Sequence, residues 1–138
     1  MAHADNKLTG KTNVVKVVGL FKRKPGLSME QFKDYYENNH IKLFDEHISH
    51  PGVLRYSRRY LEPFEGLALP LAAPKSGSYD VIMEVWYSDK ELFDSFKGQS
   101  NPDFTEIVRR DEEYLFDRDS MVMFLTEDHE SKDGPWGV

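Results

Sequence analysis

The order of strand-like and helix-like segments constrains this chain more than any other feature of its sequence. Stretches rich in β-branched and aromatic residues, which favour strands, occur at Val14–Phe21, Val53–Leu61, Tyr79–Tyr87 and Asp119–Thr126. Between the first two, apolar residues recur at helical spacing from Ser28, which opens a capping box, to the turn at Pro51. Two further helical pieces follow the third strand, one ending at Gly98 and one over 102–116. The order is therefore strand, helix, strand, strand, helix, strand.

This order is that of the ferredoxin-like fold, in which a four-stranded antiparallel sheet carries its helices on one face. We predict an α+β domain of this kind over residues 14–126, preceded by a disordered arm at 1–13 and followed by a tail at 127–138. Alternation sorts the side chains of each strand into two faces but does not say which face the helices cover. The face without helices still carries apolar and aromatic residues, so we expect a second copy to cover it in a homodimer.

Charge and composition exclude several classes of function. The 138 residues carry 18 Lys and Arg against 24 Asp and Glu, a net charge of −6, whereas a nucleic-acid binder needs a basic face. No apolar stretch approaches the roughly 18 residues of a membrane span, and the polar N-terminus lacks the apolar centre of a signal peptide. The chain has no cysteine, hence no disulfide and no thiol nucleophile. We therefore expect a cytoplasmic protein that binds neither nucleic acid nor membrane.

Histidines on the apolar stripe of the first helix are the best candidates for acid–base chemistry. His40 and His47 lie seven residues apart, nearly in register on a helix, so both are expected to point toward the core. A histidine titrates near neutral pH and can act as a general acid or base, although a buried structural histidine is the alternative. His50 is expected to end the helix. The spacing of the three does not match a zinc-binding pair, so we expect no metal.

Charged residues supply a second set of candidates. Lys22 and Arg58 are predicted to hold a substrate carboxylate or phenolate, the alternative being a solvated basic edge. Asp80 and Glu84 share one strand face and act either as acids of raised pKa or as partners of second-strand arginines across a dimer seam. For Glu84 we favour the pairing. No nucleotide-binding or nucleophile-elbow motif occurs, so any chemistry is expected to need no cofactor.

A resemblance to a known family sharpens these expectations. The run VGLFKRKPGLSMEQFKDYYENNHIKLF resembles the start of an EthD-type dimeric α+β barrel domain: a strand, a basic Pro-Gly-Leu-Ser turn, a helix with an aromatic pair, and a late histidine. The matching residues are Lys22–Ser28, Glu30, Phe32, Tyr35, Tyr36 and His40. Pro51–Tyr56 and Tyr79–Tyr87 are also similar to the family pattern, and the resemblance covers roughly residues 14–126.

One departure points to a subgroup. Many members carry His-x-Pro-Leu where this chain has His40-Ile-Lys-Leu43, and without the proline the helix is expected to continue through His47. The sequence is closer to the small fungal decarboxylases of aromatic polyketide pathways, through the matching residues Asn38, His40, Ile41, Lys42 and Leu43. That resemblance implies loss of CO2 from an atrochrysone-carboxylate-like precursor in secondary-metabolite biosynthesis.

The resulting hypothesis is a cofactor-independent decarboxylase acting on an aromatic polyketide or hydroxylated aryl acid. His40 would donate the proton, with His47 or Asp80 setting its protonation state. The proline-rich loop at 63–77 would close the pocket. The predicted substrate-binding residues are Phe21, Lys22, Tyr36, Tyr56, Arg58, Met83 and Trp86. The alternatives are a polyketide cyclase or dehydratase, a small cofactor-free monooxygenase, and a non-catalytic dimer that binds a hydrophobic metabolite.

Overall fold

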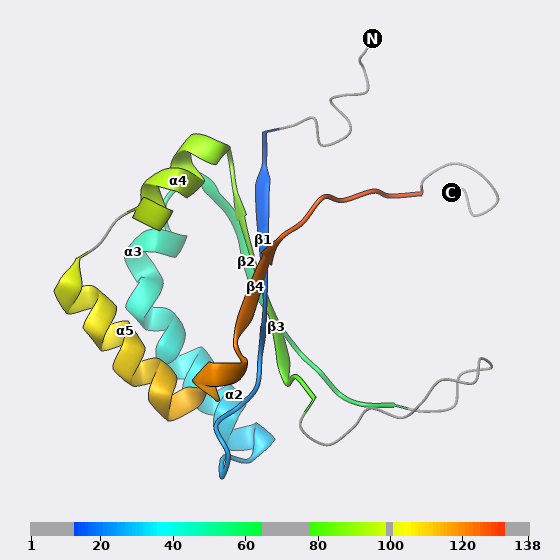
Figure 1. The fold of residues 1–138 in the computed structure, drawn as a ribbon, viewed down its shortest axis with the longest axis vertical. Coiled ribbons are helices and arrows are strands. Elements are labelled where there is room, and N and C mark those ends of the chain that lie inside the picture. The colour runs from blue at the N-terminus through cyan, green and yellow to red at the C-terminus, as the bar shows by residue number, and fades with distance from the viewer. Residues whose placement is uncertain (1–12, 65–77, 99–100, 132–138) are drawn as a thin grey trace.

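The computed structural model describes residues 13–64, 78–98 and 101–131, which form an antiparallel sheet with helices on one face (Figure 1). The strands are β1 (Val15–Phe21), β2 (Val53–Tyr60), β3 (Val81–Tyr87) and β4 (Val122–Leu125). They lie in the order β2-β3-β1-β4, and every neighbouring pair is antiparallel. The predicted α+β, ferredoxin-like architecture is therefore confirmed.

The helical segments are α2 (Met29–Asn38), η1 (His40–Phe44), α3 (Asp45–Ile48), α4 (Lys90–Gly98), α5 (Pro102–Leu115) and η2 (Arg118–Ser120). Helix α2 begins at the predicted capping box: the Ser28 hydroxyl accepts a hydrogen bond from the Gln31 amide, and the Gln31 side chain accepts one from the Ser28 amide. None of these helices is long and apolar enough to cross a membrane.

The first helix does not run unbroken to His47, contrary to the prediction. Asn39 leaves helical geometry, with φ −130° and ψ −56°, and a tighter helical turn follows. The preceding Asn38 turns its side-chain amide back to the carbonyl of Asp34, the kind of local bond by which asparagine competes with helix continuation. His40 and His47 consequently belong to different helical pieces with different surroundings.

The core lies between the sheet and the helices. It is built from alternate residues of the central strands together with aromatic residues of α2 and the end of α5: Val17, Phe21, Val81, Met83, Val85, Tyr87, Phe32, Tyr36, Leu115 and Phe116. The Phe116 ring lies 4.9 Å from that of Phe21 and 5.4 Å from that of Tyr36, measured between centroids. Phe116 therefore ties the C-terminal end of α5 to both the sheet and α2.

A bulge in β2 changes the predicted faces of that strand. Val53 pairs with Tyr87 and Arg55 with Trp86, so the register shifts between them. Because such a shift moves side chains to the opposite face, Val53 joins Tyr56 on the helix-facing side, whereas strict alternation would put it on the face of Arg55. The other face, called the helix-free face below, carries Lys16, Val18, Leu20, Arg55, Ser57, Arg59, Ile82, Glu84, Trp86, Val122 and Phe124.

The predicted terminal segments and the long loop are only partly described. Residues 1–12, 65–77 and 132–138, which include most of the predicted arm, loop and tail, lie outside the described residues. At the start of the predicted tail, Asp128 forms an ion pair with Lys16, whose Nζ lies 2.6 Å from Oδ2.

Candidate active site

His40 is buried among aromatic rings at the joint between α2 and η1. Only 4% of the residue is exposed. The centroid of its imidazole lies 5.4 Å from those of Tyr36, Phe44 and Phe116. Removing a polar ring from water in this way is costly unless its nitrogens find partners. The partner of one nitrogen is therefore the central question for this side chain.

Asp111 of α5 supplies that partner. Its Oδ2 lies 2.6 Å from His40 Nδ1, and the Tyr35 hydroxyl donates a hydrogen bond of 2.5 Å to its Oδ1. The hydrogen bond to Asp111, reinforced by burial, raises the pKa of Tyr35 to about 12, so the hydroxyl keeps its proton near neutral pH. Within the described residues, His40 forms hydrogen bonds through Nδ1 alone. Three side chains from α2, η1 and α5 thus form one connected group.

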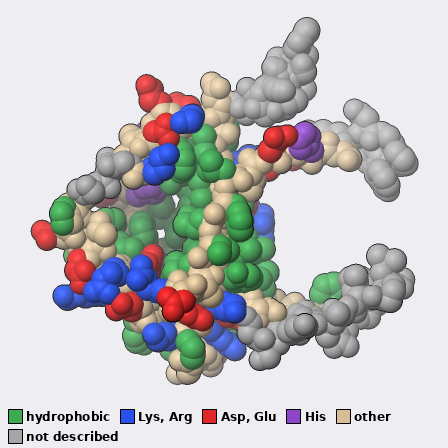
Figure 2. All heavy atoms as spheres, viewed as in Figure 1, with side chains coloured by type: hydrophobic (Ala, Val, Ile, Leu, Met, Phe, Trp, Pro, Cys, Tyr) green, Lys and Arg blue, Asp and Glu red, His purple; other side chains and the backbone are tan. Residues whose placement is uncertain are grey.

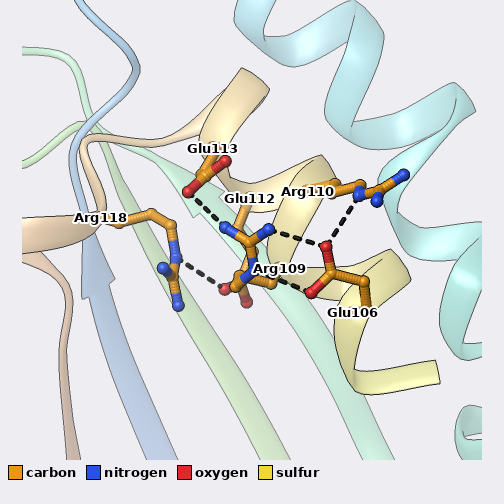
Figure 3. Close-up of polar contacts among 6 residues, drawn as sticks. All are labelled: Glu106, Arg109, Arg110, Glu112, Glu113 and Arg118. Carbon is orange, nitrogen blue, oxygen red and sulfur yellow. Dashed lines mark hydrogen bonds and ion pairs between the residues drawn. The ribbon is translucent and has the colours of Figure 1, made fainter. Parts of the chain in front are cut away.

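Contacts at both ends and along the exposed face of helix α5 fix the position of Asp111. The Asn101 side chain caps its N-terminus by accepting from the amides of Asp103 and Phe104. At its other end Leu115 and Phe116 are almost fully buried. Between these ends, ion pairs three or four residues apart brace the exposed face, as Figure 3 shows, through Glu106, Arg109, Arg110 and Glu113.

His47 belongs to a separate cluster near the start of β2. Its Nε2 lies 3.0 Å from the Tyr87 hydroxyl, and its ring packs 4.1 Å from that of Phe96. Burial, with a smaller contribution from nearby His50, lowers the pKa of His47. Burial also raises the pKa of Tyr87 to about 12, so its hydroxyl keeps its proton near neutral pH. Burial favours the neutral imidazole of His47, and within the described residues His47 is not the partner of His40.

Arg58 lies on the helix-facing side, with its charge already paired. Its Nε and Nη2 donate to the two carboxylate oxygens of Glu37 at 2.9 and 2.6 Å, and the Tyr60 hydroxyl donates to the same carboxylate. These bonds, with that of Arg58 first, lower the pKa of Glu37. The guanidinium also stacks on Tyr56, 4.9 Å from its centroid. An anion at this position would have to compete with Glu37 for Arg58.

The structure separates the remaining predicted site residues. Phe21, Tyr36, Tyr56 and Met83 lie in the layer between sheet and helices, as does His40. Trp86 is on the helix-free face and cannot line the same space within one chain. There it lies between Lys16 and Arg55, at 4.1 and 5.3 Å, and donates to Glu84 Oε2 at 2.6 Å.

The acidic candidates Asp80, just before β3, and Glu84, within β3, have partners other than the histidines. Asp80 accepts a 2.8 Å hydrogen bond from the amide of Arg23, two residues after β1. The residue beside His40 is Asp111, where His47 or Asp80 was predicted. Glu84 pairs with Arg59 of its own chain, at 3.1 Å between Oε1 and Nη2. Lys22 lies over the ring of Tyr79, 5.7 Å from its centroid.

Asp111 was not among the predicted site residues, although the sequence carries a signal for it. Asp111 follows Ile107 by four residues and precedes Leu115 by four, so it interrupts the apolar stripe of its helix. A carboxylate on a core-facing stripe requires a donor. What spacing cannot reveal is that the donors, Tyr35 and His40, lie more than 70 residues earlier in the chain.

A hollow opens between the helices and the sheet along β4 (Figure 2). Met123 and Leu125 pair with Gly19 and Val17 and so face the helix layer, yet they are 56% and 63% exposed. Across the hollow, α5 exposes Phe104 as well. Figure 2 shows hydrophobic side chains on both sides of it. The hollow is therefore an apolar opening on the side of the sheet that carries the helices and His40.

Elsewhere in residues 13–64, 78–98 and 101–131, the polar groups do not form a comparable buried site. A surface cavity of about 410 Å³ lies at the C-terminal end of α5, where most of its lining is charged: Lys24, Glu113, Asp117, Arg118 and Asp119. Among the residues that the structure describes, no group of three His, Asp or Glu side chains is arranged to hold a metal ion.

Several solved structures share the fold of this chain at low sequence identity. A solved EthD family protein from Bacillus halodurans c-125 is 16% identical, with 84% of this chain and 99% of that one covered and a TM-score of 0.54. The hydroxynitrile lyase from Passiflora edulis is 12% identical, with 87% and 97% covered and a TM-score of 0.53. SnoaB, a cofactor-independent oxygenase from Streptomyces nogalater, is 13% identical, with 88% and 99% covered and a TM-score of 0.51.

Other solved structures with this fold are described as dimeric ferredoxin-like proteins. Comparison with curated proteins gives no match. The family profile described as the EthD domain matches residues 24–129, which is more than half of the chain. The match includes His40 and Asp111. The chain therefore belongs to the EthD family.

Proposed function

We propose that the protein is a cofactor-independent lyase that removes CO2 from an aromatic polyketide or a similar hydroxylated aryl acid, with His40 as the proton donor. The observation that carries this proposal is a buried imidazole held by a carboxylate among aromatic rings, in a domain with an apolar hollow between its sheet and helices. Such a histidine can exchange a proton with a bound molecule while water is largely excluded.

The proposed reaction needs only a proton. The bond between the substrate carbon and its carboxylate breaks, CO2 leaves, and the electron pair remains on the carbon or passes into a conjugated carbonyl as an enolate. Protonated His40 gives its proton to that carbon or oxygen, and solvent restores the proton afterwards. No oxidant, metal or cofactor enters the balance.

The surrounding tyrosines suit a hydroxylated aromatic ligand. Burial raises the pKa of Tyr36 and of Tyr56, so both phenols stay neutral at pH 7 and can exchange hydrogen bonds with phenol or carbonyl groups. Met83 and Phe21 add apolar surface on the sheet side. Lys22 and Arg58 were predicted to hold the substrate carboxylate or phenolate. Arg58 would do so while it remains bonded to Glu37, and Lys22 is the second candidate.

The two named structural neighbours support the proposal that this chain is an enzyme acting on a small molecule. A hydroxynitrile lyase and a cofactor-independent oxygenase share the architecture, at 12% and 13% identity. At this distance the likeness is one of fold, and the chemistry must be argued from the site. His40 and its carboxylate favour lyase chemistry over simple binding, because a pure binder gains nothing from a carboxylate-held imidazole.

The test is a product-mass assay with purified protein and an aromatic polyketide acid. We expect loss of CO2 with the unaltered protein, and a rate lower by roughly 10²–10⁴-fold in His40→Gln, the usual contribution of a general acid. His129→Gln is the matched control, because His129 is 81% exposed near the end of the described chain. A product that has lost water or gained oxygen would replace the decarboxylase by a dehydratase or a monooxygenase. Tight binding without turnover would favour the metabolite binder.

We also propose that a second copy covers the helix-free face. Phe124 on that face is 52% exposed. An exposed aromatic side chain on a sheet face suits an interface more than a water-facing surface. Phe124→Asp should therefore halve the mass seen by sedimentation, whereas Met123→Asp, one residue earlier on the opposite side of β4, should leave it unchanged. Equal masses for the two variants would contradict this arrangement.

A further inference from the structure

The contact between Asp111 and His40 decides which imidazole nitrogen is free for chemistry. A neutral imidazole carries its proton on either Nδ1 or Nε2, and the partner of one nitrogen fixes the state of the other. An aspartate carboxylate can only accept, so at 2.6 Å the shared proton belongs to His40 Nδ1. The two ring nitrogens point in different directions, so Nε2 points away from Asp111.

We infer that Asp111 and Tyr35 are positioning residues that fix His40 as its Nδ1–H tautomer, leaving Nε2 as the atom that exchanges protons with the substrate. The step through substrate rests on the proposed function, but the tautomer itself is a property of the free protein.

Tyr35 has a distinct part in this arrangement. Its hydroxyl donates to Oδ1 of Asp111, which leaves Oδ2 for His40 and stops the carboxylate from rotating. The Tyr35 ring is itself held, 4.5 Å from the ring of Tyr114 on α5. The side chains of Asp111 and His40 are only 16% and 5% exposed, so water competes poorly for these bonds. Tyr35 thus orients Asp111, and Asp111 orients His40.

The groups that face His40 are aromatic, apart from Asp111. Tyr36 and Phe116 pack against it edge to face, as does Phe44 at a more tilted angle, and none of them is a hydrogen-bond partner of the imidazole among the described residues. Within the same part of the chain, the only charged group in hydrogen-bond contact with His40 is Asp111. A purely structural histidine would be expected to have both nitrogens bonded within the protein. Here the bonded nitrogen is the one turned toward α5.

The first experiment reads the tautomer directly and needs no substrate. Protein labelled with ¹⁵N in its histidines is examined by NMR, and the His40 signals are identified as those missing from His40→Gln. We expect the Nδ1–H tautomer in the unaltered protein. In Asp111→Asn, whose amide can donate to Nδ1, we expect a shift toward Nε2–H. An Nε2–H signal in the unaltered protein, or an unchanged signal in Asp111→Asn, would overturn the inference whatever the protein catalyses.

The kinetic arm asks whether the tautomer matters for turnover. In Asp111→Asn we expect kcat to fall by at least about a hundredfold with little change in KM; the corresponding substitution in the Ser-His-Asp arrangement costs roughly 10⁴-fold. A rise in KM at constant kcat would assign Asp111 to substrate binding instead. If the NMR result holds but no aryl acid loses CO2, the proposed function fails while the tautomer assignment stands.

Tyr35→Phe keeps the inference testable should Asp111→Asn fold poorly. It removes one hydroxyl and keeps the ring, and we expect a partial shift toward Nε2–H with a fall in kcat of roughly tenfold. Tyr114→Phe is its matched control: it removes a hydroxyl from the neighbouring ring, whereas the hydroxyl bonded to Asp111 is that of Tyr35, and it should change neither readout. Identical spectra and rates for the two variants would remove Tyr35 from the arrangement.

Discussion

His40 and His47 are the same residue type, seven positions apart, yet their imidazole rings have different hydrogen-bond partners. His40 faces a carboxylate, whereas His47 faces a phenol and stacks on Phe96. A carboxylate can only accept a hydrogen bond from the imidazole, whereas a phenol can donate or accept one, and burial lowers the pKa of His47. Partners from distant parts of the chain, more than position on a helix, therefore decide what each of these histidines can do.

The largest effect is expected from the aromatic ring beneath each histidine. Phe116 is 1% exposed and contacts His40, and Phe116→Ala should cost about 3–5 kcal/mol of unfolding free energy, the usual range for a buried phenylalanine. Phe96 packs against His47 and is only partly buried, so Phe96→Ala should lower the unfolding free energy by about half as much. Denaturant unfolding of the two alanine variants measures the difference. Equal losses would mean that the two clusters contribute equally to the core.

The next effect separates the histidines by activity. His40→Gln should reduce turnover by roughly 10²–10⁴-fold, and His47→Gln by less than about tenfold, because His40 is the proton donor that we propose. The same product-mass assay reports both variants, with circular dichroism to show that each is folded. A larger loss in His47→Gln would reverse the assignment and make His47 the acid.

The smallest effect concerns the pH dependence of stability. Burial lowers the pKa of His47 in the folded protein below its value in the unfolded chain. The unfolded chain therefore binds more protons than the folded one as the pH falls below about 6.5, and stability is lost in that direction. His47→Gln should flatten this part of the curve of unfolding free energy against pH. An unchanged slope would show that other groups cause the acid sensitivity.

The fold could be predicted because its signals are local. Strand alternation, the capping box at Ser28 and the order of the elements each involve neighbouring residues, and all point to the same architecture. The EthD resemblance rests on runs of the same kind, and the family profile confirms it.

The parts of the site that could not be predicted depend on departures from regular geometry or on distant pairing. The break at Asn39 gives His40 and His47 different neighbours, and the bulge after Val53 moves that residue to the other face of β2. Alternation places Trp86 and Met83 on opposite faces of β3, so the prediction that both bind one substrate was inconsistent within a single chain, and alternation alone does not identify the covered face. Asp111 reaches His40 across 71 residues of sequence, and no local pattern encodes that contact.

The exposed thioether of Met123, beside the hollow, has a consequence for redox chemistry. The chain has no cysteine, and Met123, at 56% exposure, is the most exposed methionine among the described residues. Oxidation would turn this apolar side chain into a polar, chiral sulfoxide beside the hollow. Treatment with peroxide would then make the hollow more polar without modifying His40. Affinities for apolar ligands should therefore be compared on protein whose methionines are reduced.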